Sequence, residues 1–157
     1  MVVAPLSWGT IAMTDSAIAQ RHSQNPSAGA AVTAILPLAG RILISAIFLI
    51  SGVMKLAAPA GTIGYIQSVG LPLPELGLAI AVVVEIGGGL ALILGYRTRA
   101  AAAALALFTL ATALLFHFNL ADQNQFIHFF KNLAITGGLL QIVAFGTPRL
   151  SLDARRS

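Results

Sequence analysis

Five polar side chains in otherwise apolar stretches of this sequence are the candidates for binding chemistry. They comprise one carboxylate, two ammonium groups, one imidazole and one amide, carried by Glu85, Lys55, Lys131, His117 and Asn132. Ionisable groups inside a membrane are costly and are therefore usually paired or functional. Two lysines facing one glutamate would leave a surplus positive charge. This combination favours an anionic or electron-rich oxygen ligand, and a quinone is the cofactor of this type that we expect.

Glu85 lies near the middle of the stretch Leu76 to Leu94, which reads LGLAIAVVVEIGGGLALIL and contains no other charge. The stretch has no polar face at helical spacing, which indicates a helix with apolar surroundings on all sides. At about 1.5 Å per residue, its length matches a bilayer core of about 30 Å. The same rise places Glu85 about 15 Å from the arginine-rich membrane face and the other four candidates roughly 20–27 Å from it. We therefore expect one cluster in the outer half of the membrane.

The composition is that of an integral membrane protein. The chain has 157 residues, of which 57% are hydrophobic and 9% charged, whereas soluble domains carry about 25% charged residues. The net charge of +4 does not indicate a nucleic-acid-binding protein, because the basic residues are scattered at the ends of apolar segments and form no patch with aromatic residues. Cysteine is absent, which excludes disulfides, thiolate nucleophiles and Cys-ligated metal centres. Any redox chemistry therefore needs a bound cofactor or a partner protein.

The hydropathy pattern predicts an all-α fold, an integral-membrane bundle of four transmembrane helices. The expected spans are residues 36–56, 76–94, 100–118 and 126–145. Pro37 suits the start of the first helix. The loop between the first two spans is broken by proline and glycine, and we expect a short interfacial helix at 62–69 within it, anchored by Tyr65. The interior of such a bundle is the natural place for the polar candidates.

The remaining residues are interpreted as tails. We expect a disordered N-terminal tail at 1–34, the transmembrane domain at 35–147 and a C-terminal tail at 148–157. The sequence Ala17-Ile18-Ala19 resembles a signal-peptide cleavage site, but no basic region precedes it and polar residues interrupt the apolar part. We therefore favour a cytoplasmic tail, and Met13 is an alternative start of the protein.

The basic residues define the expected orientation. With four spans, both lysines fall toward one side of the membrane and seven arginines fall on the other, namely Arg21, Arg41, Arg97, Arg99, Arg149, Arg155 and Arg156. Cytoplasmic segments of membrane proteins are enriched in basic residues. We therefore expect both termini and a tight turn at Gly95 to Arg99 in the cytoplasm. Arg41 lies close to the start of the first span and is expected to snorkel to that interface.

The candidate residues also have structural interpretations. Glu85 can form an ion pair with Lys55 or Lys131 that only holds helices together, and each lysine can instead snorkel to the interface. His117 and His128 lie at helix ends, where they are interfacial residues or, alternatively, axial ligands of a haem. The residue types alone leave these alternatives open.

Short motifs in all four spans, in the same order and at similar spacing, resemble the DoxX family. The resemblance covers roughly residues 36–153. In the first span and the loop after it, the matching motifs are Gly40-Arg41, Phe48, Ser51-Gly52, Lys55 and Gly70-Leu71-Pro72. Around the second span they are Glu85, Gly87-Gly88-Gly89, Gly95 and Arg97-Thr98-Arg99. In the last two spans and after them they are His117-Phe118, Lys131-Asn132, Gly137-Gly138-Leu139-Leu140 and Arg149-Leu150-Ser151-Leu152-Asp153. Residues 1–34 have no counterpart in it.

The resemblance implies a four-helix protein of the bacterial inner membrane. Some relatives are linked to sulfur oxidation as small subunits beside a thiosulfate–quinone oxidoreductase, and others to membrane-associated complexes for oxidative-stress defence. We therefore expect a subunit or accessory of a quinone-linked membrane oxidoreductase, with the lipid bilayer and a membrane or membrane-associated protein as partners and no nucleic acid. A non-catalytic scaffold or anchor is the main alternative. A small-solute permease is disfavoured, because the sequence shows no inverted repeat or unwound mid-span segment.

Overall fold

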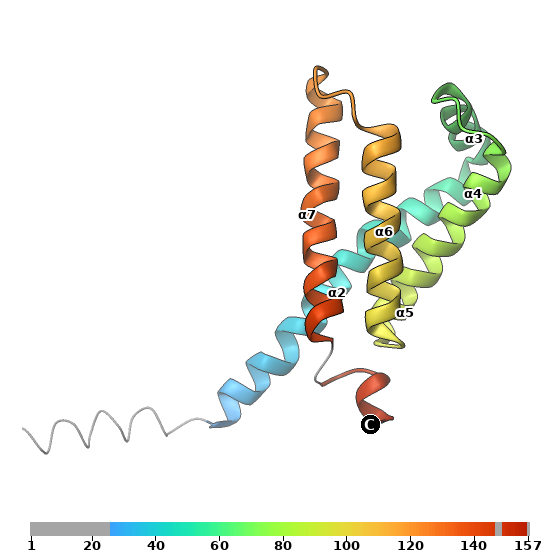
Figure 1. The fold of residues 1–157 in the computed structure, drawn as a ribbon. Helices are drawn as coiled ribbons and strands as arrows, with labels where there is room; N and C mark the ends of the chain where they lie inside the picture. The colour runs from blue at the N-terminus through green and yellow to red at the C-terminus, as the bar shows by residue number, and fades with distance from the viewer. Residues whose placement is uncertain (1–25, 147–148, 157) are drawn as a thin grey trace, which may run out of the picture.

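The chain folds into helices joined by short connections in the computed structural model, which describes residues 26–146 and 149–156 (Figure 1). Four helical segments are long and apolar enough to cross a membrane, at Ala31–Ala57, Pro74–Leu94, Thr98–Phe116 and Gln123–Phe145. The predicted all-α, four-span architecture is thereby confirmed. The expectations for residues 1–25, including the cleavage-site resemblance and the alternative start at Met13, lie outside the described residues.

The first helix, α2, spans Pro26–Ala57 and begins well before the expected first span. The prediction of a disordered tail as far as residue 34 is therefore wrong for residues 26–34, which are helical. The run that precedes the span is rich in alanine, the best helix former, and Pro26 has the preset φ that suits a first helical turn. Pro37, the predicted start signal, lies inside the helix instead.

A short helix, α3, spans Pro59–Ser68 and matches the interfacial helix expected in the loop, with an earlier start. Pro59 occupies the first turn, where its missing N–H deprives no carbonyl of a partner. Ile66 is buried against the next helix, α4 (Pro74–Val82). A Cβ added at Gly77 would lie 3.2 Å from Ile66 Cδ1, so this glycine lets α3 pack closely on α4.

The second span consists of α4, a π-helical turn η1 (Val83–Gly87) and α5 (Gly88–Leu94). A π turn takes one residue more than an α-helical turn, and such turns are frequent at functional sites. Glu85 lies in the middle of η1. The sequence predicts an uninterrupted helix here, because the residues of η1 are as compatible with an α-helix as with a π turn.

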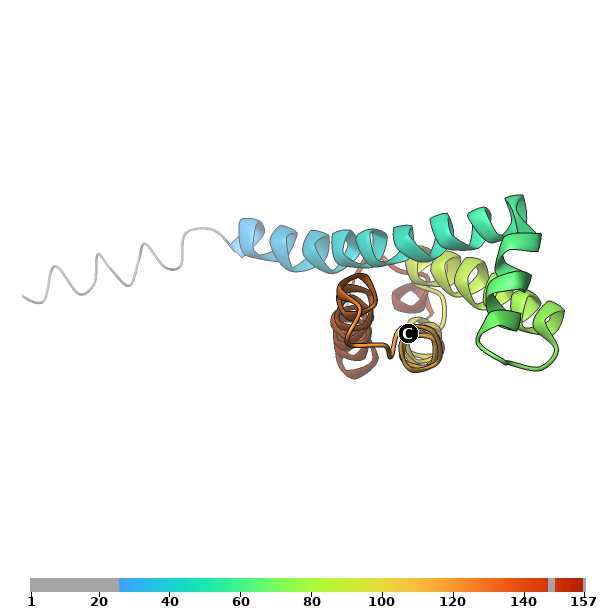
Figure 2. The same cartoon turned by 90° about the horizontal axis from the view of Figure 1, so that it is seen from above.

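The last two spans, α6 (Thr98–Phe116) and α7 (Gln123–Phe145), form an antiparallel pair. Asp122 caps the start of α7 by accepting a hydrogen bond from the backbone N–H of Gln125 at 2.9 Å. Figure 2 shows the two helices nearly end-on beside the long α2. The α6 helix also packs on α5, because Gly88 leaves room for Leu105; an added Cβ there would lie 2.8 Å from Leu105 Cγ.

The helices are packed together at one end of the molecule and diverge at the other. The buried core lies near the turn between α5 and α6 and draws on all four spans, through Phe48, Leu92, Ala102, Leu105, Ala106 and Leu139. From this core α4 and α3 lean away from α6 and α7, as Figure 1 shows. We call the end with the α5–α6 turn the closed end and the end with α3 the open end.

Residues 149–156, which we call the C-terminal clamp, fold back across the α5–α6 turn at the closed end. The backbone N–H groups of Leu152 and Asp153 donate hydrogen bonds to the carbonyls of Leu94 and Gly95, at 3.1 and 2.9 Å. A short 3-10 helix, η2 (Asp153–Arg155), follows. The segment expected as a tail at 148–157 is therefore attached to the helices over the part that the structure describes.

Arg41 is buried under this clamp and is only 1% exposed. Its Nη2 donates a hydrogen bond to Leu150 O at 2.7 Å, and its Nη1 donates one to Leu92 O at 3.3 Å. The prediction that Arg41 snorkels is wrong, because its two terminal nitrogens donate to these backbone carbonyls inside the protein. The Nε atom is also buried and has no hydrogen-bond partner among the described residues. Gly95, with φ of +67°, makes the room: an added Cβ would collide with Arg41 Nη1 and Ser151 Cβ.

Candidate functional site

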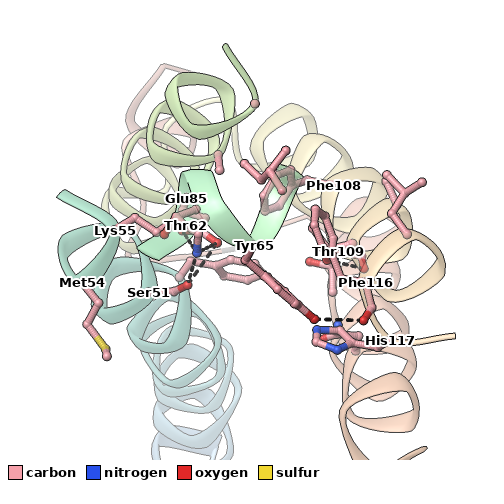
Figure 3. A pocket seen from close by; sticks show the side chains of 18 of the residues that line it. Ser51, Met54, Lys55, Thr62, Tyr65, Glu85, Phe108, Thr109, Phe116 and His117 are labelled. Atoms are coloured by element: carbon pink, nitrogen blue, oxygen red, sulfur yellow. Dashed lines mark hydrogen bonds and ion pairs between the residues drawn. The ribbon is translucent and has the colours of Figure 1, made fainter. Parts of the chain in front are cut away.

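A cavity of about 850 Å³ lies at the open end, between the diverging helices (Figure 3). All five predicted candidates line it, from α2, η1, α7 and the end of α6: Lys55, Glu85, Lys131, Asn132 and His117. Most of the remaining lining is aliphatic or aromatic and includes Ile47, Ile50, Met54, Ile80, Phe108 and Leu115. Binding sites for small molecules commonly have this size and this mixture of an apolar wall with a few polar groups.

Lys55 and Glu85 form a salt bridge in the wall of the cavity. Lys55 Nζ lies 2.9 Å from Glu85 Oε1 and 3.0 Å from Oε2, so the ammonium contacts both carboxylate oxygens. Ser51, one turn before Lys55, accepts a hydrogen bond from Nζ at 2.6 Å and donates one to Glu85 Oε1 at 3.1 Å. Ser51 is not among the predicted site residues. Its position four residues before Lys55, on the same helix face, is the signal that could have identified it.

Two backbone features bring this pair together. Gly52 is buried where α2 crosses η1, and an added Cβ would lie 2.6 Å from Ile86 Cγ1. The absence of a side chain at Gly52 therefore lets α2 approach the second span closely. The π turn changes the rotation of the helix between α4 and α5, and Glu85 emerges from it toward α2, only 5% exposed. Glycine on one helix and the π turn on the other thus position the salt bridge.

Lys131 lies on α7 and does not pair with Glu85. Its Nζ lies 2.8 Å from His128 Nδ1 on the same helix, and it forms no ion pair with a described carboxylate. Of the two counter-ions predicted for Glu85, only Lys55 is confirmed. The reason lies in the helix arrangement, because α7 meets α2 toward the closed end, where Gly138 packs on Ile44.

His117 and His128 form a stacked pair where α6 ends and α7 begins. Their ring centroids are 5.1 Å apart and their planes are inclined by 26°. Two axial ligands of one haem lie on opposite sides of its iron, whereas these rings lie against each other. The stacked geometry therefore does not support the haem alternative. Within the described part of the chain, His, Asp and Glu side chains form no group of three that could hold a metal ion.

Tyr65 and Asn132 complete the polar lining. Tyr65 on α3 donates a hydrogen bond to Phe116 O at 3.1 Å, and its ring packs on that of Phe116 with centroids 5.3 Å apart. Figure 3 shows Tyr65 between the salt bridge and His117. The side-chain amide of Asn132 has no hydrogen-bond partner among the described residues. Its two donors and its acceptor are therefore available to a ligand.

The charges and hydrogen-bonding groups of the cavity suit an amphiphilic ligand. Lys55 is neutralised by Glu85, whereas Lys131 contributes a positive charge without a carboxylate partner among the described residues. Asn132, the residue after Lys131, adds the two N–H donors of its side-chain amide. A ligand with oxygen acceptors on a polar head and an apolar body would satisfy both the donors and the aliphatic wall.

Four spans and a partly polar cavity at one end define the chain as a small multi-pass membrane protein. Residues 36–118 match the DoxX family model, and the chain belongs to this family. It is 40% identical over 116 residues to the inner membrane protein YqjF of Escherichia coli (strain K12), covering 74% of this chain and 88% of that protein. It is 35% identical over 126 residues to the inner membrane protein YphA of the same organism, covering 77% and 90%. No solved structure matches the chain at a significant level.

Proposed function

We propose that this chain is a subunit or accessory of a quinone-linked oxidoreductase complex in the bacterial inner membrane, with the quinone head held in the cavity at the open end. The observation that carries the proposal is the convergence of five polar residues from several helices on one mainly apolar cavity. A quinone bound there would supply two-electron, two-proton redox chemistry. The relatives YqjF and YphA, both named as inner membrane proteins, support the location.

The donor set of the cavity fits a quinone head. Its carbonyl oxygens need hydrogen-bond donors, and the Lys131 ammonium and the free amide of Asn132 supply them. The ring and the tail of a quinone are apolar and match the aliphatic wall. Ile50 and Leu115 line the cavity and are 62% and 51% exposed. These residues continue the apolar wall toward the lipid, from which a quinone would enter.

The proposal includes a protein partner, and the residue content of the chain supports it. The sequence contains no cysteine, so it has no thiol to donate electrons and no thiolate to hold an iron–sulfur cluster. We infer that the electrons reach the cavity from a redox centre in another protein. In this proposal the chain binds the quinone and presents it to that partner.

The proposal is tested by measuring whether the purified full-length protein retains a quinone. The protein is isolated from native membranes in mild detergent, extracted with organic solvent, and its quinone content is quantified by mass spectrometry. We expect close to one quinone per chain in the wild type. Lys131→Met combined with Asn132→Leu removes the two donors assigned to the quinone head and should strongly reduce retention. Gln141→Leu, a matched change on the exposed side of α7, should leave retention unchanged.

A wild-type protein that neither retains a quinone nor binds an added short-chain quinone would contradict this function. A stoichiometric protein partner without any quinone would instead support the second candidate, a non-catalytic membrane scaffold. One observation favours that candidate: Lys55, Glu85 and Ser51 satisfy one another without a ligand. In that candidate function, the network holds α2 against the second span and has no further role.

A further inference from the structure

The stacked pair His117–His128 lies between the cavity and an exposed connection. His117 is the residue at which α6 ends, and His128 lies in the second turn of α7. Both rings line the cavity, and residues 118–122, which lead from His117 to α7, are all exposed. The pair is therefore placed to exchange protons between a ligand in the cavity and the outside of the protein.

The hydrogen-bond partners of the two rings select opposite tautomers. His117 Nδ1 lies 2.7 Å from Gln125 Oε1, an oxygen that can only accept, so Nδ1 carries the proton and Nε2 has a free lone pair. His128 Nδ1 lies 2.8 Å from the Lys131 ammonium, which can only donate, so Nδ1 is the acceptor and Nε2 carries the proton. The pair thus offers one free acceptor, on His117, and one free donor, on His128.

The charges around the pair favour a negative ligand next to it. Lys131 from α7 is a positive neighbour, and Tyr65 from α3 is a neutral phenol that donates to Phe116 O. The Lys55–Glu85 salt bridge in the same cavity has no net charge. No carboxylate of the described residues contacts either ring, so a proton taken up by the pair would be stabilised by a negative charge on the ligand.

We propose that His117 accepts the hydroxyl proton of a quinol bound in the cavity; this inference rests on the proposed function. In this step the O–H bond of the ligand breaks, a bond from hydrogen to His117 Nε2 forms, and the electron pair of the O–H bond stays on the ligand oxygen. No electron is transferred and no further reactant is needed. His128, through its Nε2–H, and Lys131, through its ammonium, supply donors to the oxygen that becomes negative.

This role distinguishes the reduced ligand from the oxidised one. A quinol has a hydroxyl proton to give to His117 Nε2, whereas a quinone has none. A proton from the solvent and the quinol hydroxyl compete for the same Nε2 lone pair, because a doubly protonated ring has no acceptor left. Quinol binding should therefore weaken at low pH, and quinone binding should not.

The experiment measures the affinity of the full-length protein in lipid nanodiscs for a short-chain ubiquinol and for its quinone form, between about pH 5.5 and pH 8.5. In the wild type we expect the quinol affinity to fall on acidification and the quinone affinity to hold. His117→Gln should lower the quinol affinity roughly tenfold at the upper pH and remove its pH dependence, with quinone binding unchanged. His128→Gln removes a donor to the ligand oxygen and should lower the affinity for both forms, but it should retain the pH dependence because His117 is intact.

The outcomes separate this inference from the function on which it rests. If neither ligand binds the wild type, the quinone site itself is refuted. If both ligands bind and His117→Gln leaves the pH dependence of quinol binding in place, the inference about His117 is overturned. It is also overturned if His128→Gln is the only variant that removes this pH dependence. Should His117→Gln not fold, Gln125→Leu tests the same step. This variant keeps His117 but removes the hydrogen-bond partner of its Nδ1. The quinol affinity should then fall while the quinone affinity stays at the wild-type value. A quinol affinity equal to that of wild type would count against the proposal.

Discussion

The carboxylate of Asp153 accepts hydrogen bonds from both the backbone N–H and the side-chain hydroxyl of Thr98, a residue 55 positions earlier in the chain, at 2.8 and 2.7 Å. The backbone N–H of Arg97 donates to the other carboxylate oxygen at 2.8 Å. The first N–H groups of a helix have no partner within the helix and need an acceptor from outside. The residue that precedes α6 supplies no side-chain cap. Asp153 therefore caps α6 in place of a local residue and ties the clamp to the closed end.

Removing this cap should destabilise the protein. We expect Asp153→Ala to lower the free energy of unfolding by about 1–2 kcal/mol, the usual cost of losing a helix cap. Arg155→Ala, two residues away and exposed, is the matched control and should change stability little. Thermal unfolding in detergent is the measurement. If the Asp153 variant is as stable as the control, the clamp does not stabilise the closed end.

The contribution of Asp153 should also depend on pH. Hydrogen bonds from the Thr98 backbone, the Thr98 hydroxyl and the Arg97 backbone, together with the charge of Arg156, hold the pKa of Asp153 below its ordinary value of 3.8. A carboxyl whose pKa is lower in the folded state stabilises the fold above its unfolded pKa, and this stabilisation is lost as the pH falls through the folded value. The stability difference between wild type and Asp153→Asn should therefore be constant near neutral pH and shrink below about pH 4. A difference that grows on acidification would contradict this assignment.

The Lys55–Glu85 salt bridge is tested by a double-mutant cycle. Glu85→Gln or Lys55→Met alone breaks a largely buried pair and should cost about 3–5 kcal/mol, whereas the double variant should recover much of the loss. Lys131 contacts His128 and not Glu85, so Lys131→Met combined with Glu85→Gln should be additive within about 0.5 kcal/mol. Coupling between Glu85 and Lys131 in unfolding measurements would show that the pairing is wrong.

The same variants separate a scaffold from a ligand site. If the salt bridge only holds helices together, the Glu85→Gln, Lys55→Met double variant should recover cellular function together with stability. If the pair also shapes the quinone site, the double variant should be stable but should have lost its quinone. Quinone content of the purified double variant decides between the two.

Packing at Gly88 should not tolerate a large side chain. An added Cβ there already falls within 3 Å of Leu105, so Gly88→Leu should push α5 from α6 and cost about 1–3 kcal/mol. Gly137 on α7 has no atom within 4 Å of an added Cβ, so Gly137→Leu is a matched control that should be tolerated. Thermal stability and monodispersity in detergent are the readouts. Equal behaviour of the two variants would contradict the packing of α5 on α6.

The orientation in the membrane is a further prediction from the arginines. A reporter that is active only outside the cytoplasm should be silent when fused after Ser157 and active when inserted near Gln123. The reverse pattern would place the clamp outside the cell and refute the topology. A cytoplasmic reporter at the same two positions should give the complementary result.

Hydropathy and charge spacing were enough to predict the four spans and the cluster of polar residues, because both depend on position along a helix axis. Lys55 and Glu85 were expected at compatible depths, and the structure joins them. The choice between Lys55 and Lys131 was not predictable, since it depends on how the helices are rotated and where they diverge. Nor was the partner of Arg41, because the acceptors are backbone carbonyls, which every residue carries. The π turn leaves no pattern in the sequence either, although it determines where Glu85 points.

The bond from Arg41 to Leu150 has a consequence for the order of events during synthesis. Arg41 leaves the ribosome 109 residues before Leu150, so the first span enters the membrane while its guanidinium still lacks this acceptor. We expect the charge to remain among the lipid headgroups until the later residues arrive, and to be withdrawn into the protein only then. Burial of Arg41 in the first span would thus depend on completion of translation. Nascent chains that stop at Phe145 should keep that charge exposed, and in pulse-labelling they should be degraded faster than complete ones; equal lifetimes would refute this.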